Sequence, residues 1–146
     1  MSHLQPPTIL LVEDNLGHAR LIEKNLRRAK ITHNIILLRD GQQALDYLFS
    51  RHRGPLSNLL MLLDLNLPIL NGYQVLKRIK KDDRTKRIPV VVLTTTDDPH
   101  EVDTCYELGC NFYITKPVEY SKFSQAIRQL SHFLSVVTVP ITGYSK

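Results

Sequence analysis

The chain has 146 residues, of which 42% are hydrophobic and 23% are charged, a composition typical of a folded globular protein. This is the length of one domain, which buries roughly 70% of the surface of its unfolded chain. No apolar stretch approaches the roughly 18 residues of a membrane span, and residues 1–7 lack the basic and apolar regions of a signal peptide. We therefore expect a cytoplasmic protein with no membrane segment.

The net charge of +5 raises the question of nucleic-acid binding. The densest basic stretch covers residues 77–87, but Asp82 and Asp83 interrupt it and no aromatic residue is interleaved for base stacking. We interpret this stretch as a solvated helix end and loop, whose cations complement the helix dipole. No nucleic-acid partner is expected.

The cysteines and histidines do not indicate a metal or redox site. Cys105 and Cys110 are too few for a disulfide framework, and they form neither a CxxC motif nor a cluster with histidine. We expect one buried and one partly buried thiol in a reducing compartment. The six histidines are scattered without the spacing of metal ligands.

The predicted elements begin with an apolar strand over residues 8–13, after which Asn15 caps a helix. The expected buried face of this helix consists of Ala19, Ile22, Leu26 and Ala29. A second strand covers residues 34–38, and the turn at Asp40 and Gly41 leads into a second helix. The side chains that this second helix is expected to bury are Ala44, Leu45, Leu48 and Phe49.

A third strand covers residues 59–64, and a loop at 68–72 precedes a helix through Val75, Leu76 and Ile79. The fourth strand covers residues 90–94. A loop at 95–99 follows it, and then a helix through Val102, Cys105 and Tyr106 that stops at Gly109.

The fifth strand covers residues 111–115, and the last helix follows. Its apolar residues recur at spacings of three and four, as on the buried face of a helix: Phe123, Ala126, Ile127, Leu130, Phe133, Leu134 and Val137. The whole pattern is five strand-then-helix units, which implies right-handed crossovers and helices on both faces of a parallel sheet. The predicted fold is therefore α/β, a doubly wound five-stranded parallel sheet of the flavodoxin-like kind.

Asp64 ends the apolar run of the third strand, which reads as a buried central strand. A carboxylate in that position is costly unless something there uses it. In an open α/β sheet, ligands bind at this edge, outside the carboxyl ends of the strands. Asp64 is therefore a candidate reactive group.

Other strands end in complementary groups: the first in Glu13 and Asp14, the fourth in Thr94, and the fifth just before Lys116. Clustered carboxylates raise one another's pKa unless a cation intervenes, and oxygen ligands suit Mg²⁺. A lysine ammonium and a threonine hydroxyl can stabilise anionic oxygens beside that metal. Each residue also has a plain structural explanation, as a helix cap, a strand residue or a solvated lysine. Together they predict a carboxylate that accepts a phosphoryl group.

Four segments that carry these residues, 10–15, 62–68, 91–95 and 113–117, resemble the receiver domain of two-component response regulators in order and spacing. The resemblance covers residues 8–134, between an N-terminal tail at 1–7 and a C-terminal extension at 135–146. Residues 39–41, 44–48 and 93–95 are similar to a narrower group, the stand-alone regulators paired with bacterial and cyanobacterial phytochromes.

The resemblance implies a role for each residue of the site. Asp64 would accept the phosphoryl group of a phosphohistidine on a kinase, which the narrower resemblance identifies as a phytochrome-type histidine kinase. Mg²⁺ would be bound by Asp14, Asp64 and the backbone carbonyl of Asn66, with Glu13 acting through a bound water. Lys116, aimed by a cis bond to Pro117, would pair with the phosphoryl oxygens.

The resemblance also implies a switch. Thr94 would swing its hydroxyl onto the phosphoryl group, and Tyr113 would then change its exposure. Asn66, Thr95 and Thr96 flank the site and would influence hydrolysis of the phosphoryl group. Glu13 stands where aspartate is commoner, Ser57 and Asn58 where Pro-Asp is common, and Asn71 where aspartate is usual; none of these departures removes a reactive group.

The segment after the last helix is too short for a DNA-binding module, so we expect output through protein contacts. The end of the last helix and the tail together carry more apolar side chains than a surface helix needs: Phe133, Leu134, Val136, Val137 and Val139, with Pro140. They either pack within the chain or join a homodimer face. The resemblance implies such a face on the fourth helix, the fifth strand, the last helix and the tail.

Two other functions stay open. One is a small Mg²⁺-dependent phosphatase with an aspartyl-phosphate intermediate. Such an enzyme would need a second aspartate at the position of Asn66, and also a sizeable cap that covers the substrate. The other is a basic nucleic-acid-binding adaptor. The leading prediction is a single-domain response regulator that is phosphorylated on Asp64 and turns over no separate substrate.

Overall fold

The computed structural model describes residues 7–51, 56, 58–116 and 119–136. Its strands are β1 (Thr8–Val12), β2 (Ile35–Leu38), β3 (Leu59–Leu63), β4 (Val90–Thr94) and β5 (Phe112–Thr115). Its helices are α1 (Leu16–Arg28), α2 (Gly41–Asp46), α3 (Gly72–Lys81), α4 (Pro99–Leu108) and α5 (Tyr120–Val136), and a π-helical turn, η1 (Tyr47–Arg51), extends α2. None of these helices is long and apolar enough to cross a membrane.

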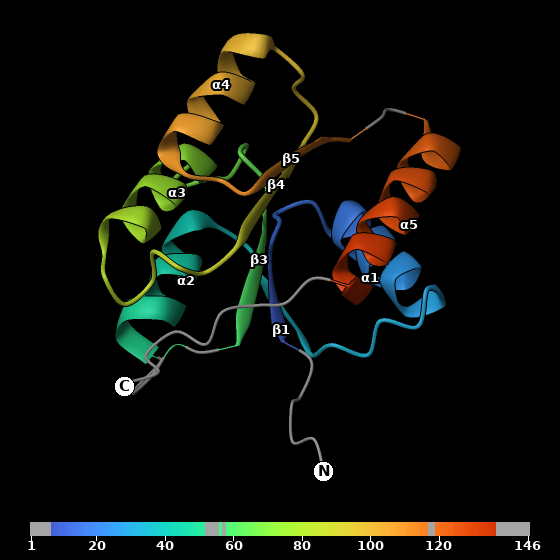
Figure 1. Cartoon of the computed structure of the whole chain (residues 1–146), viewed down its shortest axis with the longest axis horizontal. Helices are drawn as coiled ribbons and strands as arrows, with labels where there is room; N and C mark the ends of the chain where they lie inside the picture. Colours follow the sequence, from blue (N-terminus) through green and yellow to red (C-terminus); the bar gives the residue numbers. More distant parts are fainter. Residues whose placement is uncertain (1–6, 52–55, 57, 117–118, 137–146) are drawn as a thin grey trace.

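The strands form one parallel sheet in the order β2-β1-β3-β4-β5. Helices α1 and α5 cover one face, and α2, α3 and α4 cover the other (Figure 1). The reversal of strand order between β1 and β3 is the point at which doubly wound sheets bind ligands. The predicted fold class is confirmed.

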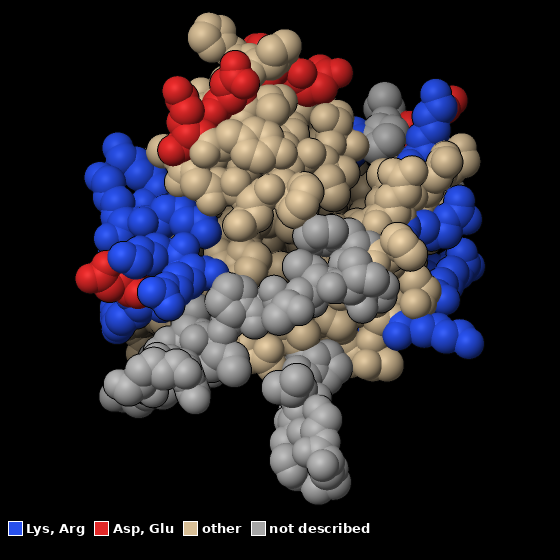
Figure 2. Space-filling view, in the orientation of Figure 1, with Lys and Arg blue, Asp and Glu red and all other residues tan. Residues whose placement is uncertain are grey.

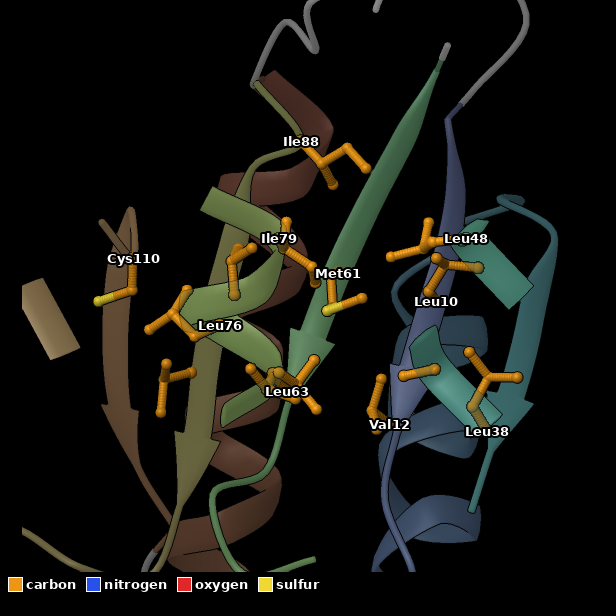
Figure 3. Packing of buried hydrophobic residues seen from close by; sticks show 14 of the residues in the cluster. Leu10, Val12, Leu38, Leu48, Met61, Leu63, Leu76, Ile79, Ile88 and Cys110 are labelled. Carbon is orange, nitrogen blue, oxygen red and sulfur yellow. The ribbon is translucent and has the colours of Figure 1, made fainter. Parts of the chain in front are cut away.

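Alternation along the central strands explains why the third strand is apolar throughout. In β3, Met61 and Leu63 pack on the face of α2 and α3, whereas Leu60 and Leu62 pack on the face of α1 and α5. Figure 3 shows the first of these layers, in which β3 lies between α3 and α2. A strand covered on both sides leaves no position for a polar side chain until it ends, which is where Asp64 follows.

Short polar side chains fix where the helices begin. Asn15 accepts a hydrogen bond from the backbone N–H of His18, and Asn71 forms a reciprocal capping box with Gln74. Gly109 ends α4 with a φ of 105°, a left-handed conformation that glycine adopts without strain. These caps set the loops between strands and helices that surround the strand ends.

Three details differ from the sequence-based expectations. Ala29 is exposed, because α1 ends at Arg28 and Ala29 is its C-cap. Leu45 and Phe49 are only half-buried, since they lie at the rim of the core, and Ala126 of α5 is half-buried as well. Cys110 is buried like Cys105, because its side chain belongs to the core cluster on the α3 and α4 side. The tail beyond Val136, including Val137, lies outside the described residues.

The basic stretch forms part of the surface, where Lys and Arg gather over α3 and the loop that follows it (Figure 2). On this surface, the carboxylate of Asp82 forms ion pairs with Arg78 at 3.6 Å and with Arg84 at 3.3 Å. The carboxylate of Asp83 pairs with Lys86 at 3.0 Å. The guanidinium of Arg78 also lies 4.0 Å from the ring centre of Phe49. Three of the cations of this basic stretch are thus paired within the chain, as expected of a solvated helix end.

Candidate functional site

Four strand ends meet at one edge of the sheet. The backbone N–H of Asp64 donates to the carbonyl of Val12, which brings Asp64 beside the Glu13 that follows β1. The N–H of Lys116 donates to the carbonyl of Thr94, so the ends of β4 and β5 are joined as well. The parallel register therefore gathers carboxylates, a hydroxyl and an ammonium from positions far apart in the chain.

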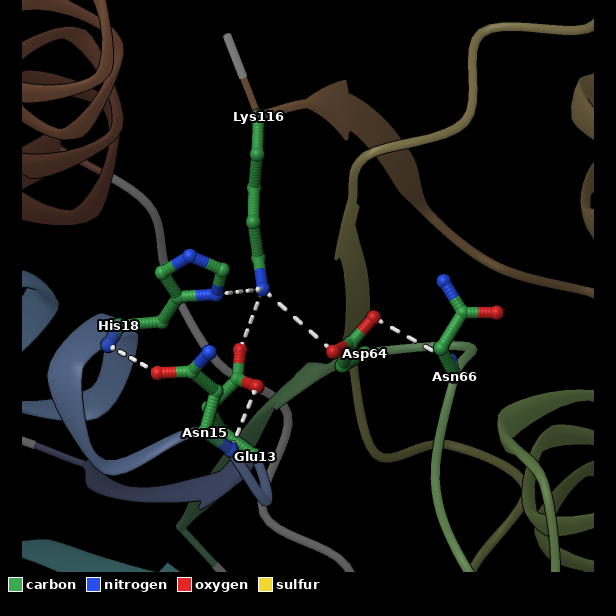
Figure 4. Close-up of polar contacts among 6 residues, drawn as sticks. All are labelled: Glu13, Asn15, His18, Asp64, Asn66 and Lys116. Carbon is green, nitrogen blue, oxygen red and sulfur yellow. Dashed lines mark hydrogen bonds and ion pairs between the residues drawn. The ribbon is translucent and has the colours of Figure 1, made fainter. Parts of the chain in front are cut away.

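Lys116 lies at the centre of this site, with only 4% of its surface exposed. Its Nζ is 2.5 Å from Oε1 of Glu13, 3.2 Å from Nδ1 of His18 and 3.4 Å from Oδ2 of Asp64 (Figure 4). A buried ammonium is stable only when anions or other acceptors surround it. The three contacts account for the three N–H donors of the ammonium.

Glu13 is almost wholly buried, at 1% exposure. Burial raises the pKa of its carboxyl to about 7, although the hydrogen bond and charge of Lys116 act in the opposite direction. The charge of Asp64 raises this pKa further, and the N–H of Asn15, which donates to Oε2 at 3.2 Å, lowers it. The site holds more negative charge than one lysine balances, which favours a further cation.

The carboxylates themselves have the arrangement of a metal site. Oxygen atoms of Glu13, Asp14 and Asp64 all lie within 4.8 Å of one another. Asp14 is the most exposed of the three, and Arg39 fixes its backbone by donating to its carbonyl at 3.0 Å. Hard oxygen donors in this number fit a small dication such as Mg²⁺ or Mn²⁺. The backbone N–H of Asn66 donates to Oδ1 of Asp64 at 3.2 Å, so the loop after β3 also borders the site.

Thr94 places a buried hydroxyl at the end of β4. It is fully buried, and its Oγ1 has no hydrogen-bond partner among the described residues. An unsatisfied buried hydroxyl is uncommon and calls for an explanation, such as a ligand that is absent. Thr95, the next residue, is exposed.

Thr96 and Tyr113 belong to a network on the α4 side of the site. Tyr113 is half-buried on β5, and its hydroxyl donates to the carbonyl of Thr96 at 2.7 Å. The hydroxyl of Thr96 in turn donates to Oε2 of Glu101, at 2.7 Å. Tyr73 of α3 donates to the other carboxylate oxygen of Glu101 at 2.5 Å. The loop after β4 is therefore tied to α3, α4 and β5.

The structure brings Glu13, Asp14, Asp64 and Lys116 together, with Thr94 at the adjoining strand end. Pro117, and with it the expected cis bond, lies outside the described residues. Sequence reasoning missed His18, whose place in the first turn after the Asn15 cap was the signal available. It also missed the acceptor role of Glu101, which no local pattern marks.

This geometry can be compared with known proteins. A family model described as the response regulator receiver domain matches residues 9–128. The chain belongs to the response regulator receiver family. A crystal structure of a receiver domain from Rhodospirillum rubrum is 54% identical, covers 92% of this chain and 98% of its own, and superposes with a TM-score of 0.88.

Two similar receivers come from cyanobacteria. Response regulator Rcp1 of Synechocystis is 41% identical over 92% of this chain and 94% of its own length. A structure of its Mn²⁺-bound form superposes with a TM-score of 0.82 and covers 99% of that chain. The phosphorylated cyanobacterial phytochrome response regulator RcpA is 38% identical, with a TM-score of 0.82 and coverage of 93% and 99%. The resemblance inferred from the motifs is confirmed, and the phosphatase and nucleic-acid adaptor alternatives are not favoured.

Proposed function

We propose that this receiver takes a phosphoryl group onto Asp64 from the phosphohistidine of a kinase. An Asp64 oxygen attacks phosphorus, an O–P bond forms, the P–N bond breaks, and the electron pair returns to the imidazole of the kinase. The observation that carries the proposal is the pairing of the Asp64 carboxylate with the buried Lys116 ammonium inside a cluster of three carboxylates.

The neighbouring groups have supporting roles in this proposal. Lys116 stabilises the transferred oxygens as a fixed positive charge. The buried hydroxyl of Thr94, which lacks a partner among the described residues, bonds a phosphoryl oxygen, and Tyr113 then leaves its contact with Thr96. Asn66, Thr95 and Thr96 border the site and influence hydrolysis of the phosphoryl group, and we assign the same influence to Pro117 from its place in the sequence after Lys116.

We assign the metal site to Glu13, Asp14, Asp64 and the backbone carbonyl of Asn66, with Mg²⁺ as the ion. Oxygen donors and a phosphoryl substrate suit Mg²⁺, which binds through few carboxylates and keeps several waters. When bound, it neutralises charge on the phosphoryl oxygens. The carboxylates hold the ion at the edge of the sheet, and the ammonium of Lys116 offsets the repulsion between them when no ion is bound.

We propose a phytochrome-type histidine kinase as the partner, because RcpA is named as a phytochrome response regulator and is similar over most of its length. This partner also implies where the protein works, which is the cytoplasm, because such kinases use ATP there. The protein would turn over no separate substrate, and its own phosphoryl group would be lost by hydrolysis.

We assign residues 8–134 to the receiver domain and residues 135–146 to an extension, although α5 itself continues to Val136. Output would pass through a homodimer formed by α4, β5, α5 and the tail. In support, Tyr106 and Phe112 expose nearly half of their surface on this side. A cavity of about 180 Å³ between β5 and α5 is lined by Phe112, Ile114, Ala126, Gln129 and Leu130.

The test is labelling with a small phosphodonor and Mg²⁺. The wild type and a control Asp46→Asn, whose residue lies in α2 away from the site, should form a stable adduct. Asp64→Asn should form none. Turnover of varied phosphoesters would favour the phosphatase, and an adduct on Asp64→Asn would contradict the assignment of Asp64.

A further inference from the structure

His18 contacts Lys116 but has no part in the phosphoryl chemistry proposed above. It lies in the first turn of α1, 98 residues from Lys116 in sequence, and its Nδ1 is 3.2 Å from Nζ. An ammonium donates hydrogen bonds and accepts none. Nδ1 must therefore be the acceptor, which requires a neutral ring that carries its proton on Nε2.

Two further contacts fix the position of this ring. The backbone N–H of His18 donates to Oδ1 of Asn15 at 3.0 Å, which holds the first turn of α1. The imidazole meets the ring of Phe123 on α5 edge-on, at 5.7 Å between centres and 89° between planes. Burial, and then the charge of Lys116, lower the pKa of His18, in keeping with a neutral ring.

The distances around Nζ indicate what the ring does. The ammonium is much closer to Glu13, at 2.5 Å, than to Asp64, at 3.4 Å. Nδ1 of His18 is the third acceptor around this ammonium, and it limits how far the ammonium can move toward Glu13. It leaves one N–H directed at Asp64, the residue that needs it during transfer.

We propose that His18 is a positioning residue for Lys116, which holds the ammonium toward the Asp64 oxygen through a hydrogen bond to Nδ1. This role rests on the functions proposed for Asp64 and Lys116. Without the acceptor, Lys116 pairs with Glu13 alone and faces the phosphoryl group less often. The rate of phosphoryl uptake then falls, while the fold is retained.

Two substitutions separate positioning from packing. His18→Asn keeps an acceptor oxygen near the place of Nδ1 but loses the ring. His18→Leu keeps an apolar contact with Phe123 but has no acceptor. We expect phosphorylation by a small phosphodonor with Mg²⁺ to be about tenfold slower in His18→Leu, the effect of one hydrogen bond to a charged group. His18→Asn should restore most of that loss.

The opposite order, or equal rates in all three proteins, would overturn the proposal, because a ring that only packs against Phe123 is replaced better by leucine than by asparagine. A wild type that takes up no phosphoryl group overturns the proposed function and this role with it. Labelling of the wild type with the wrong order of variants overturns the role of His18 alone.

A second measurement needs neither metal nor phosphodonor. The ¹⁵N shifts of the His18 ring, recorded well above the ordinary histidine pKa of 6.5, report which nitrogen carries the proton. We expect the Nε2–H form in the wild type, and a shift of the Nδ1 signal in Lys116→Met. A proton on Nδ1, or an Nδ1 signal that ignores Lys116→Met, would overturn the contact.

Discussion

At the scale of single residues, Lys116 links the stability of the domain to its chemistry. Its ammonium is buried between the carboxylates of Glu13 and Asp64, and neither carboxylate has another cation beside it among the described residues. Breaking a buried ion pair from one side leaves an uncompensated charge, which costs far more than the pair itself contributes. The same lysine thus keeps the metal-free site folded and is ready for the phosphoryl oxygens.

We therefore expect Lys116→Met to lower the free energy of unfolding by about 3 kcal/mol without metal. Mg²⁺ should recover more stability in the variant than in the wild type, since it can replace the missing charge. Urea unfolding with and without Mg²⁺ measures both effects. Equal stability of the two metal-free proteins would mean that the ion pairs contribute little.

His33 predicts how stability depends on pH. It is buried, and neither ring nitrogen has a hydrogen-bond partner in the part of the chain that the structure describes. Burial, and then the charge of Arg27, lower its pKa below the ordinary 6.5. Below pH 6.5, the imidazole is therefore protonated more readily in the unfolded chain than in the folded chain. The contribution of the neutral ring to stability is present above pH 6.5 and is lost as the pH falls.

We expect acidification below pH 6.5 to destabilise the wild type more than His33→Leu, which has no ring to protonate. Urea midpoints at several pH values give the two slopes, and the difference between them isolates His33 from other titrating groups. Parallel slopes would show that His33 is protonated alike in the folded and unfolded chains.

At the scale of elements, the hydrogen bonds of Glu101 decide how firmly the loop after β4 is held. This carboxylate accepts from Tyr73 on α3 and from Thr96 in the loop, and the carbonyl of Thr96 accepts from Tyr113 on β5. The proposed movement of Tyr113 must break at least one of these bonds. The network therefore favours the conformation seen here.

Tyr73→Phe should lower the free energy of unfolding by about 1 kcal/mol, the net value of one partly exposed hydrogen bond to a carboxylate. The matched control is Tyr106→Phe, which removes a longer, neutral contact of 3.2 Å with the N–H of Tyr113 and should cost less. Thermal unfolding of both variants gives the comparison. A larger loss in Tyr106→Phe would place the main restraint elsewhere.

The elements also show how far the sequence alone could lead. Strand ends were predictable because burial on both faces leaves polar residues such as Asp64 only where a strand stops. The bond between His18 and Lys116 was not, because it joins the first turn of α1 to the residue that follows β5, 98 positions away in the chain. Nor could Ala29 be placed, since an apolar residue at the right spacing says nothing of where a helix ends.

At the scale of the whole molecule, a phosphoryl group on Asp64 can act on a partner only by changing the surface of the domain. The apolar side chains of Tyr106 and Phe112 on the α4 and β5 side are candidates for the surface that makes this contact. We expect a homodimer in solution that is weakened by Phe112→Asp, because burying a carboxylate in an apolar contact is costly. Light scattering with and without a beryllofluoride mimic measures this, and a monomer in both states would remove the dimer.

The central claim is that Asp64 carries the phosphoryl group, and intact-mass measurement after incubation with phosphodonor and Mg²⁺ tests it most directly. We predict a mass gain of one phosphoryl group, with reductive trapping and peptide mapping that place the modification at residue 64. No gain on the wild type, or a modification mapped to another residue, would contradict the account.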